Sequence, residues 1–245
     1  CDIYFYEAAR RLGVDRLAVT SNKFGLGSKV FGNLDEERNG LVPTTKWKLN
    51  TLGRGWVLGE TLLAGIGQGY FQTTPMQICL MTAQIANGGY KIKPRLIIEQ
   101  DKQSAFEFRN DKFTKLYDNQ ENVKFVQDAL FGATNEPMGT SYRSRHVKSK
   151  YIFAGKTGTS QIRRITKEER ELKLKQTDLP YKRRDHALFT AFAPYNNPRY
   201  ALSIVIEHGG TGSSAAAPIA KKIIKKVLDR HKLRKKYQSD LFQEV

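Results

Sequence analysis

Residues 151–161, with the sequence YIFAGKTGTSQ, carry the side chains best suited to chemistry in this chain. An apolar, strand-like start leads through Gly155 to a lysine, Lys156. Hydroxyl side chains follow it directly, at Thr157, Thr159 and Ser160. A cation beside hydroxyls and the N–H groups of a strand edge suits the binding of a carboxylate and of an oxyanion. We therefore interpret this stretch as the centre of the candidate site.

Two nucleotide-binding patterns come close to this chain, and both fail. Gly155-Lys156-Thr157 would end the phosphate-loop pattern G-x-x-x-x-G-K-[ST], but Lys150 stands where its first glycine is required. Residues 65–70 begin like the dinucleotide pattern G-x-G-x-x-G, but Tyr70 stands at its last glycine. We therefore expect the glycines of residues 65–69 to shape the backbone and not to bind a ligand.

Composition allows one large domain or two small ones. The chain has 245 residues, of which 40% are hydrophobic and 11% aromatic, enough for a real core. Its formal net charge of +17 favours an anionic partner, and a solvated basic surface is an equally open interpretation. Nucleic acid is not expected, because no aromatic residues alternate with the lysines at a spacing suited to base stacking.

The ends and the cysteines give limited information about context. No apolar stretch approaches the roughly 18 residues of a membrane span, and no signal peptide opens the chain. The chain starts at Cys1, without a methionine, and runs directly into helix-like sequence. We therefore expect it to be part of a longer protein. Cys1 could pair with Cys79 in principle, but the apolar surroundings of Cys79 favour a buried free thiol.

Periodicity predicts a mainly helical part over residues 1–150. The first helix is expected over residues 2–12 with Gly13 as its stop, and a later one starts at Thr74-Pro75, an N-cap followed by proline. That later helix is apolar nearly all round and is expected to be buried. The other predictions are helices at 15–23 and 123–131, an ordered loop at 28–60, an extended segment at 90–98 and a short strand at 105–108.

The second half predicts a β-β-β-α arrangement over residues 151–233, followed by a tail at 234–245. Strands at 186–193 and 199–207 flank a turn rich in proline and asparagine, which indicates an antiparallel meander with the central strand. A final helix from Ala215 is expected to turn Ile219, Ile223, Ile224 and Val227 to the sheet. Residues 162–184 are charged and form an unusually long connection, which indicates an exposed excursion.

Several motifs in this order and spacing resemble one family, and the resemblance covers nearly the whole chain. K-T-G belongs with S-x-x-K in serine β-lactamases and penicillin-binding proteins. The motifs are Cys1-Asp2 before an aromatic helix, Gly65-Ile66-Gly67-Gln68-Gly69 with Thr74-Pro75-Met76-Gln77, Gly155-Lys156-Thr157-Gly158-Thr159, Asp185-His186-Ala187-Leu188, residues 191–198 and Glu207-His208-Gly209-Gly210. Together they resemble the C-terminal part of the transpeptidase domain of elongation-type class B penicillin-binding proteins (penicillin-binding protein 2).

The resemblance implies an α+β fold, a five-stranded antiparallel sheet flanked by helices. It implies a serine D,D-transpeptidase that cross-links peptidoglycan stem peptides and is inhibited by β-lactams. Lys156 would supply positive charge and a hydrogen-bond relay, and the Thr159 N–H would donate to the oxyanion. The hydroxyls of Thr157 and Thr159 would hold the substrate's terminal carboxylate, Gly158 would let the substrate lie close, and Asp2 would end the second motif.

The chain also departs from the family pattern. S-x-x-K is absent, and the nearest match, Ser160-Gln161-Ile162-Arg163, ends in an arginine that cannot act as a base. The nucleophile, two strands and the serine of the second motif S-x-D would therefore precede residue 1, and the fragment alone is expected to be inactive. A non-catalytic basic module that binds cell-wall polymer or a partner protein is the alternative.

The resemblance implies further partners and one metal. Cys1 would be a zinc ligand completed by upstream residues, in keeping with the preference of zinc for thiolate, imidazole and carboxylate ligands; the alternative is an ordinary thiol. The implied partners are stem peptides, β-lactams and membrane proteins of the elongation machinery. The implied location is the periplasmic face of the bacterial inner membrane, with an anchoring span that this chain lacks.

Overall fold

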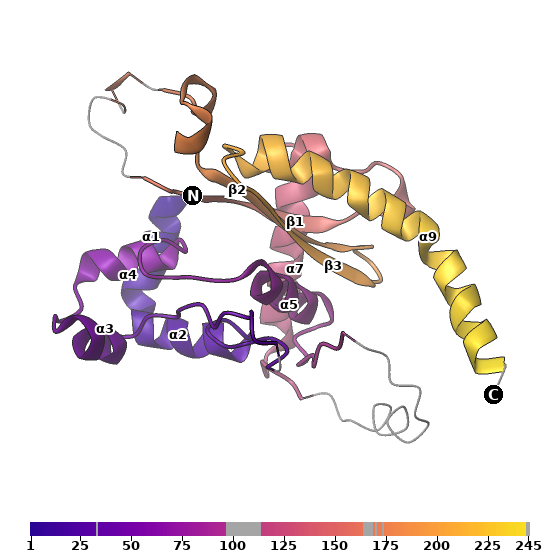
Figure 1. Ribbon diagram of the computed structural model, residues 1–245, viewed down its shortest axis with the longest axis horizontal. Coiled ribbons are helices and arrows are strands. Elements are labelled where there is room, and N and C mark those ends of the chain that lie inside the picture. The colour runs from indigo at the N-terminus through magenta and orange to yellow at the C-terminus, as the bar shows by residue number, and fades with distance from the viewer. Residues whose placement is uncertain (33, 97–113, 164–168, 170, 173, 244–245) are drawn as a thin grey trace. The chain divides into compact units, whose positions relative to one another are not determined.

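The computed structural model describes residues 1–32, 34–96, 114–163, 169, 171–172 and 174–243, with side chains described up to His231. The chain forms two compact units, Cys1–Val123 and Lys124–Val245. This division falls within residues 1–150, which the sequence predicted as one mainly helical part. No helix in the described residues is both long enough and apolar enough to cross a membrane. Figure 1 shows the elements of each unit.

The first unit is helical. Its helices are α1 (Asp2–Leu12), α2 (Val14–Lys23), α3 (Thr45–Leu52), α4 (Leu58–Gly65) and α5 (Pro75–Ala86). The bounds of α1 are those predicted, with Gly13 at its C-cap, where φ is 80°. α1 packs closely on α4, since a Cβ added at Gly65 would lie 2.4 Å from the Cβ of Ala9. The glycine at position 65 therefore has a packing role, in agreement with its predicted role in shaping the backbone.

The prediction of a loop over residues 28–60 is wrong, because α3 lies within this range and α4 begins in it. α3 starts at Thr44, whose side chain accepts a hydrogen bond from the N–H of Trp47. Helical periodicity was hidden because the buried positions are polar: Lys48 is 5% exposed and Thr61 6% exposed. A search for apolar residues at helical spacing cannot find helices whose inner faces carry a lysine and a threonine.

α5 begins as predicted, but it is not buried through its apolar residues. Thr74 caps it in a reciprocal pair with Gln77. The fully buried side chains are mostly polar, while Met76 is 44% exposed. Gln77 donates to the carbonyls of Ser28 and Asn39, and Gln84 donates to the carbonyl of Phe24. The helix therefore fixes the preceding loop through buried amides, each of which has backbone partners.

The segment after α5 forms less regular structure than predicted. Tyr90 makes an isolated bridge with Lys115, and residues 91–95 form no strand. The short strand predicted at 105–108 and the end of the segment predicted at 90–98 lie outside the described residues. Cys1 and Cys79 are both free thiols, as favoured for Cys79, and burial raises the pKa of the Cys79 thiol.

The second unit contains the predicted antiparallel meander. Its strands are β1 (Ala154–Ser160), β2 (His186–Ala193) and β3 (Tyr200–Ile206), hydrogen-bonded in the order β1-β2-β3. The register pairs Lys156 with Thr190 and Thr190 with Ser203. This gives the predicted α+β class; of the five strands that the resemblance implies, the described residues contribute three.

Two helices accompany the sheet of the second unit. α7 (Gln120–Asn135) is longer than the predicted helix at 123–131, and α9 (Ala217–Gln243) packs across one face of the sheet (Figure 1). Short single-turn helices connect the elements: η1 (Tyr142–Ser144), η2 (Ser149–Tyr151), η3 (Gln176–Asp178), η4 (Tyr181–Arg183) and a π-helical turn, η5 (Gly212–Ala216). η3 and η4 belong to the predicted excursion, of which residues 164–168, 170 and 173 are not described.

The core of this unit lies between the sheet and α9; it confirms the predicted packing of Ile224 and corrects that of Ile219 and Ile223. Alternate residues of β2, among them Phe189 and Ala191, pack with Phe153, Ala217, Ala220 and Ile224. Ile219 and Ile223, predicted to face the sheet, are 39% and 40% exposed. Small alanines fill the contact instead, which lets the helix lie close to the strands. α9 also continues to Gln243, through residues predicted as a tail.

Candidate active site

Strand β1 is held by polar side chains of α7. The Thr134 hydroxyl donates to the carbonyl of Gly155 over 3.2 Å, and the Asn135 amide donates to the carbonyl of Phe153 over 2.9 Å. Gly155 has no room for a side chain, because an added Cβ would lie 2.5 Å from the carbonyl oxygen of Thr190. The residue before Lys156 is therefore fixed on both sides, and the lysine projects from a rigid strand.

Lys156 and its neighbours form a polar edge. Lys156 is exposed, and its Nζ donates to the carbonyl of Thr157 at 3.0 Å and to the Thr157 hydroxyl at 3.3 Å. The Thr157 hydroxyl in turn donates to the hydroxyl of Thr140 over 3.3 Å. Thr159 is exposed further along the strand. Among the described residues β1 pairs with β2 alone, so its other side is an edge that a peptide can approach.

The predicted site residues of β1 lie on two different faces of the strand. Side chains alternate along a strand, so Thr157 and Thr159 share one face while Lys156 lies on the other. The register places Thr157 opposite Phe189 and Thr159 opposite Ala187. Gly158 lies between the two threonines, and an added Cβ there would approach the Cβ of Leu188 to 3.3 Å. The two hydroxyls predicted to hold one carboxylate are therefore on the same side of the sheet.

The remaining predicted residues belong to the other unit. Cys1 is exposed at the N-cap of α1, and Asp2 is in the first turn of that helix. Because they lie in Cys1–Val123 and β1 does not, their position relative to Lys156 stays a prediction. No group of three or more His, Cys, Asp or Glu side chains in the described part of the chain is arranged to bind a metal. An exposed thiol fits zinc as one ligand, and the others would have to come from elsewhere.

A pocket beside β1 was not predicted from the sequence. Its volume is about 360 Å³, and its lining includes Thr140, Tyr142, Arg143, Ser213 and Ser214. It adjoins the strand, because Thr140 contacts the Thr157 hydroxyl. The sequence signal was faint: a glycine precedes hydroxyl residues in both Gly139-Thr140-Ser141 and Gly212-Ser213-Ser214. Only the fold brings these two segments together.

His186, at the start of β2, has a structural partner. The backbone N–H of His208 donates to His186 Nδ1 over 2.9 Å, and the two rings are 4.9 Å apart. His208 is itself held through a contact between its Nδ1 and the carbonyl of Arg184 at 3.0 Å. His208 has a φ of 54°, an unusual conformation for a non-glycine residue. This pair fixes the end of the sheet next to Ser160.

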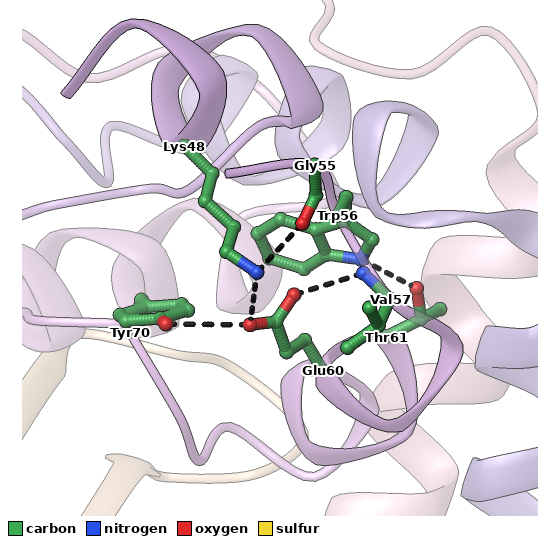
Figure 2. Close-up of polar contacts among 7 residues, drawn as sticks. All are labelled: Lys48, Gly55, Trp56, Val57, Glu60, Thr61 and Tyr70. Atoms are coloured by element: carbon green, nitrogen blue, oxygen red, sulfur yellow. Dashed lines mark hydrogen bonds and ion pairs between the residues drawn. The ribbon is translucent and has the colours of Figure 1, made fainter. Parts of the chain in front are cut away.

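A second lysine, in the first unit, has a contrasting environment (Figure 2). The Nζ of Lys48 lies 2.5 Å from Glu60 Oε1 and donates to the carbonyl of Gly55 at 2.8 Å. Glu60 also accepts from Tyr70 and from the N–H of Val57. Burial acts to raise the pKa of Glu60, but the hydrogen bonds from Lys48 and Val57 outweigh it and hold the pKa below its usual 4.5. This cluster stabilises the segment between α3 and α4.

Residues 1–225 match the penicillin-binding protein transpeptidase domain. The chain therefore belongs to the penicillin-binding protein transpeptidase family, as the motifs predicted.

Named relatives and solved structures agree with this assignment. The chain is 34% identical to the peptidoglycan D,D-transpeptidase MrdA of Salmonella typhimurium over 93% of its own length and 36% of the relative's. It is 33% identical to MrdA of Escherichia coli, over 93% and 35%. It thus spans about a third of the length of these curated relatives.

The fold is also that of solved penicillin-binding protein structures. The Helicobacter pylori penicillin-binding protein PBP2, in complex with MreC, matches with a TM-score of 0.78 and 29% identity, over 94% of this chain and 38% of that one. Pseudomonas aeruginosa PBP2, in complex with WCK 5153, matches with a TM-score of 0.73 and 34% identity, over 94% and 48%.

Proposed function

We propose that the protein to which this chain belongs is a peptidoglycan D,D-transpeptidase that cross-links stem peptides during cell elongation and is acylated by β-lactams. The observation that carries the proposal is strand β1, which presents Lys156, Thr157 and Thr159 along an open edge in a chain of this family. The curated relatives named peptidoglycan D,D-transpeptidase support the reaction.

The proposed reaction is acyl transfer in two steps. A serine oxygen attacks the carbonyl carbon of the penultimate D-alanine, and the terminal D-alanine leaves with the proton that the serine gives up. The amine of a second stem peptide then attacks the ester carbonyl; a C–N bond forms as the C–O bond breaks, and a proton from the amine returns to the serine oxygen. Both steps pass through an oxyanion that backbone N–H groups stabilise.

The described residues have assigned roles in this proposal. Lys156 supplies positive charge and a hydrogen-bond relay next to the serine, for which a cation on a rigid strand is suited. The Thr159 N–H donates to the oxyanion. The hydroxyls of Thr157 and Thr159, on one face of the strand, hold the terminal carboxylate, and Gly158 between them leaves room for the substrate backbone.

The nucleophile is proposed to lie outside this chain. The printed sequence contains no S-x-x-K, and Asp2 is proposed to end a second motif whose serine precedes Cys1. The 245-residue chain alone should therefore form no acyl-enzyme. Cys1 is proposed as one ligand of a structural zinc, and zinc bound per molecule of the full-length protein, compared with its Cys1→Ser variant, tests this.

The partner protein and the cellular location are also proposals. MreC is the partner in the H. pylori structure, and we propose a membrane protein of the elongation machinery as a partner here. The location proposed is the periplasmic face of the inner membrane, with an anchoring span outside this chain.

Labelling with a fluorescent penicillin tests the function. The full-length protein should form a covalent adduct that survives denaturing electrophoresis, and the 245-residue chain should not. Unlabelled penicillin added first should prevent the labelling. A full-length protein that is folded but unlabelled contradicts the proposal and favours the non-catalytic basic module, which would bind anionic polymer in a salt-sensitive way.

A further inference from the structure

Helix α9 carries a row of cations on the side that faces away from the sheet. Lys222, Lys226 and Arg230 follow one another at every fourth residue, so they line up along one side of the helix over about 12 Å. All three side chains are exposed, and in the described part of the chain they have no hydrogen-bond or ion-pair partner. Three positive charges in a line are therefore available to an external partner.

Two more cations lie beside this row. Lys225 donates to Asp229 over 2.7 Å, and Nζ of Lys150, in η2, lies 3.6 Å from the same carboxylate. The hydroxyl of Tyr151 also donates to Asp229. The hydrogen bond from Lys225, followed by that from Tyr151, lowers the pKa of Asp229 to about 2, so this carboxylate stays ionised. It is the single carboxylate among the described side chains of α9, and because two lysines share it, the surface around it stays positive.

The shape of this surface indicates the kind of anion that it suits. We call the exposed cations Lys150, Lys222, Lys225, Lys226 and Arg230 the basic face. Since α9 lies across the sheet (Figure 1), its outer side is convex and cannot enclose a small anion. An extended polymer that repeats its negative charges can contact several of these cations at once. Each exposed ion pair is weak, but linked contacts add to one another.

A membrane surface fits this helix less well. A helix that lies in the headgroup region buries its apolar side in the lipid. The apolar side of α9, with Ala217, Ala220 and Ile224, is already packed on the sheet. Of the large apolar side chains described for α9, Ile219 and Ile223 are the exposed ones. Charge, and not apolar area, therefore dominates the outer side of the helix.

We propose that the basic face binds peptidoglycan outside the reaction centre, through the carboxylates that stem peptides repeat along a glycan strand. The inference rests on the proposed function for the identity of the polymer, and it adds a docking surface that takes no part in acyl transfer. The basic face holds the protein on the polymer between one cross-link and the next, while the peptides that react bind at β1.

Co-sedimentation of the full-length protein with purified, insoluble peptidoglycan tests the basic face. The protein is first saturated with penicillin, so that the reaction centre is blocked. The bound fraction should fall as the salt concentration rises, because the charges are exposed. Peptidoglycan whose stem carboxylates have been converted to carboxamides should bind about tenfold more weakly, as expected for the loss of several exposed ion pairs.

The test variant combines Lys222→Gln, Lys226→Gln and Arg230→Gln. It should bind peptidoglycan about tenfold more weakly than the natural protein, because three exposed ion pairs are lost. Its melting temperature should change little, since the three side chains are exposed. If this variant does not fold, the single variant Lys226→Glu takes its place and should also weaken binding.

The matched control combines Arg38→Gln, Lys46→Gln and Lys91→Gln, which removes three positive charges from exposed positions of the first unit. It should bind like the natural protein. Equal binding by the test variant and the control, or equal binding of the natural protein to both forms of peptidoglycan, would overturn the proposal. Phosphatidylglycerol vesicles that displace the protein from peptidoglycan at an equal concentration of negative charge would also overturn it, in favour of a membrane surface.

Penicillin labelling separates the docking surface from the proposed function. A protein that takes up no penicillin but binds peptidoglycan through the basic face contradicts the proposed function and supports the docking surface. Normal labelling, together with binding that does not depend on the basic face, contradicts the docking surface alone.

Discussion

Two lysines, one in each unit, show how differently the same side chain is used. Lys48 is 5% exposed and bonds to Glu60 and the carbonyl of Gly55, and Glu60 is bonded by two further groups. Lys156 is exposed on an edge strand, and its Nζ donates to the carbonyl and the hydroxyl of Thr157, the next residue. The first lysine is matched by a carboxylate, whereas the second lies beside hydroxyls that suit an external carboxylate.

The comparison of Lys48 with Lys156 indicates that the groups around a lysine identify its role better than its burial does. A buried ion pair with all its partners present stabilises a particular loop geometry, and its charge is not available for a ligand. Lys156 is exposed on a rigid strand and bonds to the carbonyl and the hydroxyl of Thr157. We therefore expect substitutions of Lys48 to change stability and substitutions of Lys156 to change activity.

The largest effect is expected at Lys156. In the full-length protein, Lys156→Met should slow acylation by penicillin about 1000-fold, since it removes a preorganised charge from the reaction centre. The melting temperature should change little, because the side chain is exposed. Stopped-flow acylation and thermal unfolding measure the two quantities. The control is Lys148→Met, which changes another exposed lysine of this unit. Equal acylation rates in the two variants would contradict a role for Lys156 in the active site.

A slightly smaller effect, on stability, is expected at Lys48. Lys48→Met leaves the Glu60 carboxylate without its cationic partner and should lower the free energy of unfolding by about 3 kcal/mol. Denaturant unfolding of the full-length protein measures this, and Lys46→Met, on the exposed side of α3, should be close to neutral. The double variant Lys48→Met, Glu60→Gln should recover part of the loss. A Lys48→Met protein that has normal stability but is not acylated by penicillin would contradict the assignment of Lys48 to stability and not to activity.

Gly155→Ala should have an intermediate effect on both properties. The new Cβ would meet the carbonyl oxygen of Thr190 at 2.5 Å, so the strand must shift, at a cost of about 2 kcal/mol. Because Lys156 is the next residue, acylation should also slow. Gly59→Ala is the matched control, since nothing lies within 4 Å of an added Cβ there. Equal melting temperatures for these two variants would show that β1 is not fixed as described.

The smallest effect is a pH dependence of the Lys48 cluster. The folded pKa of Glu60 is below its usual 4.5, so the carboxylate stabilises the fold above that pH, and this contribution is lost as the pH falls through the folded value. The difference in melting temperature between the natural protein and Glu60→Gln should therefore be greatest near neutral pH and shrink below about 4.5. A difference that is constant with pH would mean that Glu60 stabilises through shape alone.

Much of the fold followed from local signals in the sequence. The bounds of α1 and β2 were predicted because apolar residues recur at helical or strand spacing and because Gly13 and Pro194 act as stops. α3 and α4 were missed because their buried residues, Lys48 and Thr61, are polar. The partners that make such burial favourable, Glu60 and Trp56, are identified by the folded geometry and not by periodicity.

The candidate site was predictable only in part for a related reason. The strand with Lys156 is continuous in sequence, so its residue types and spacing were sufficient. The pocket combines the segment around Thr140 with the turn at Ser213, which are far apart in the chain. Their proximity depends on the contact of Gly212 with two strand carbonyls, and no pattern of residue types records a contact of that kind.

Under the proposed function, that contact at Gly212 also bears on how resistance to β-lactams could evolve. Its backbone touches the carbonyls of Gly158 and Leu188, so a mutation that moves β1 to weaken penicillin binding also moves the turn that carries Ser213 and Ser214. Under the proposed function, such a mutation also displaces the strand that carries Lys156, so drug evasion and efficient cross-linking would be selected in opposite directions. Compensating substitutions in resistant lineages are expected to cluster in η5 and around Thr140, where the turn can adapt without altering Lys156.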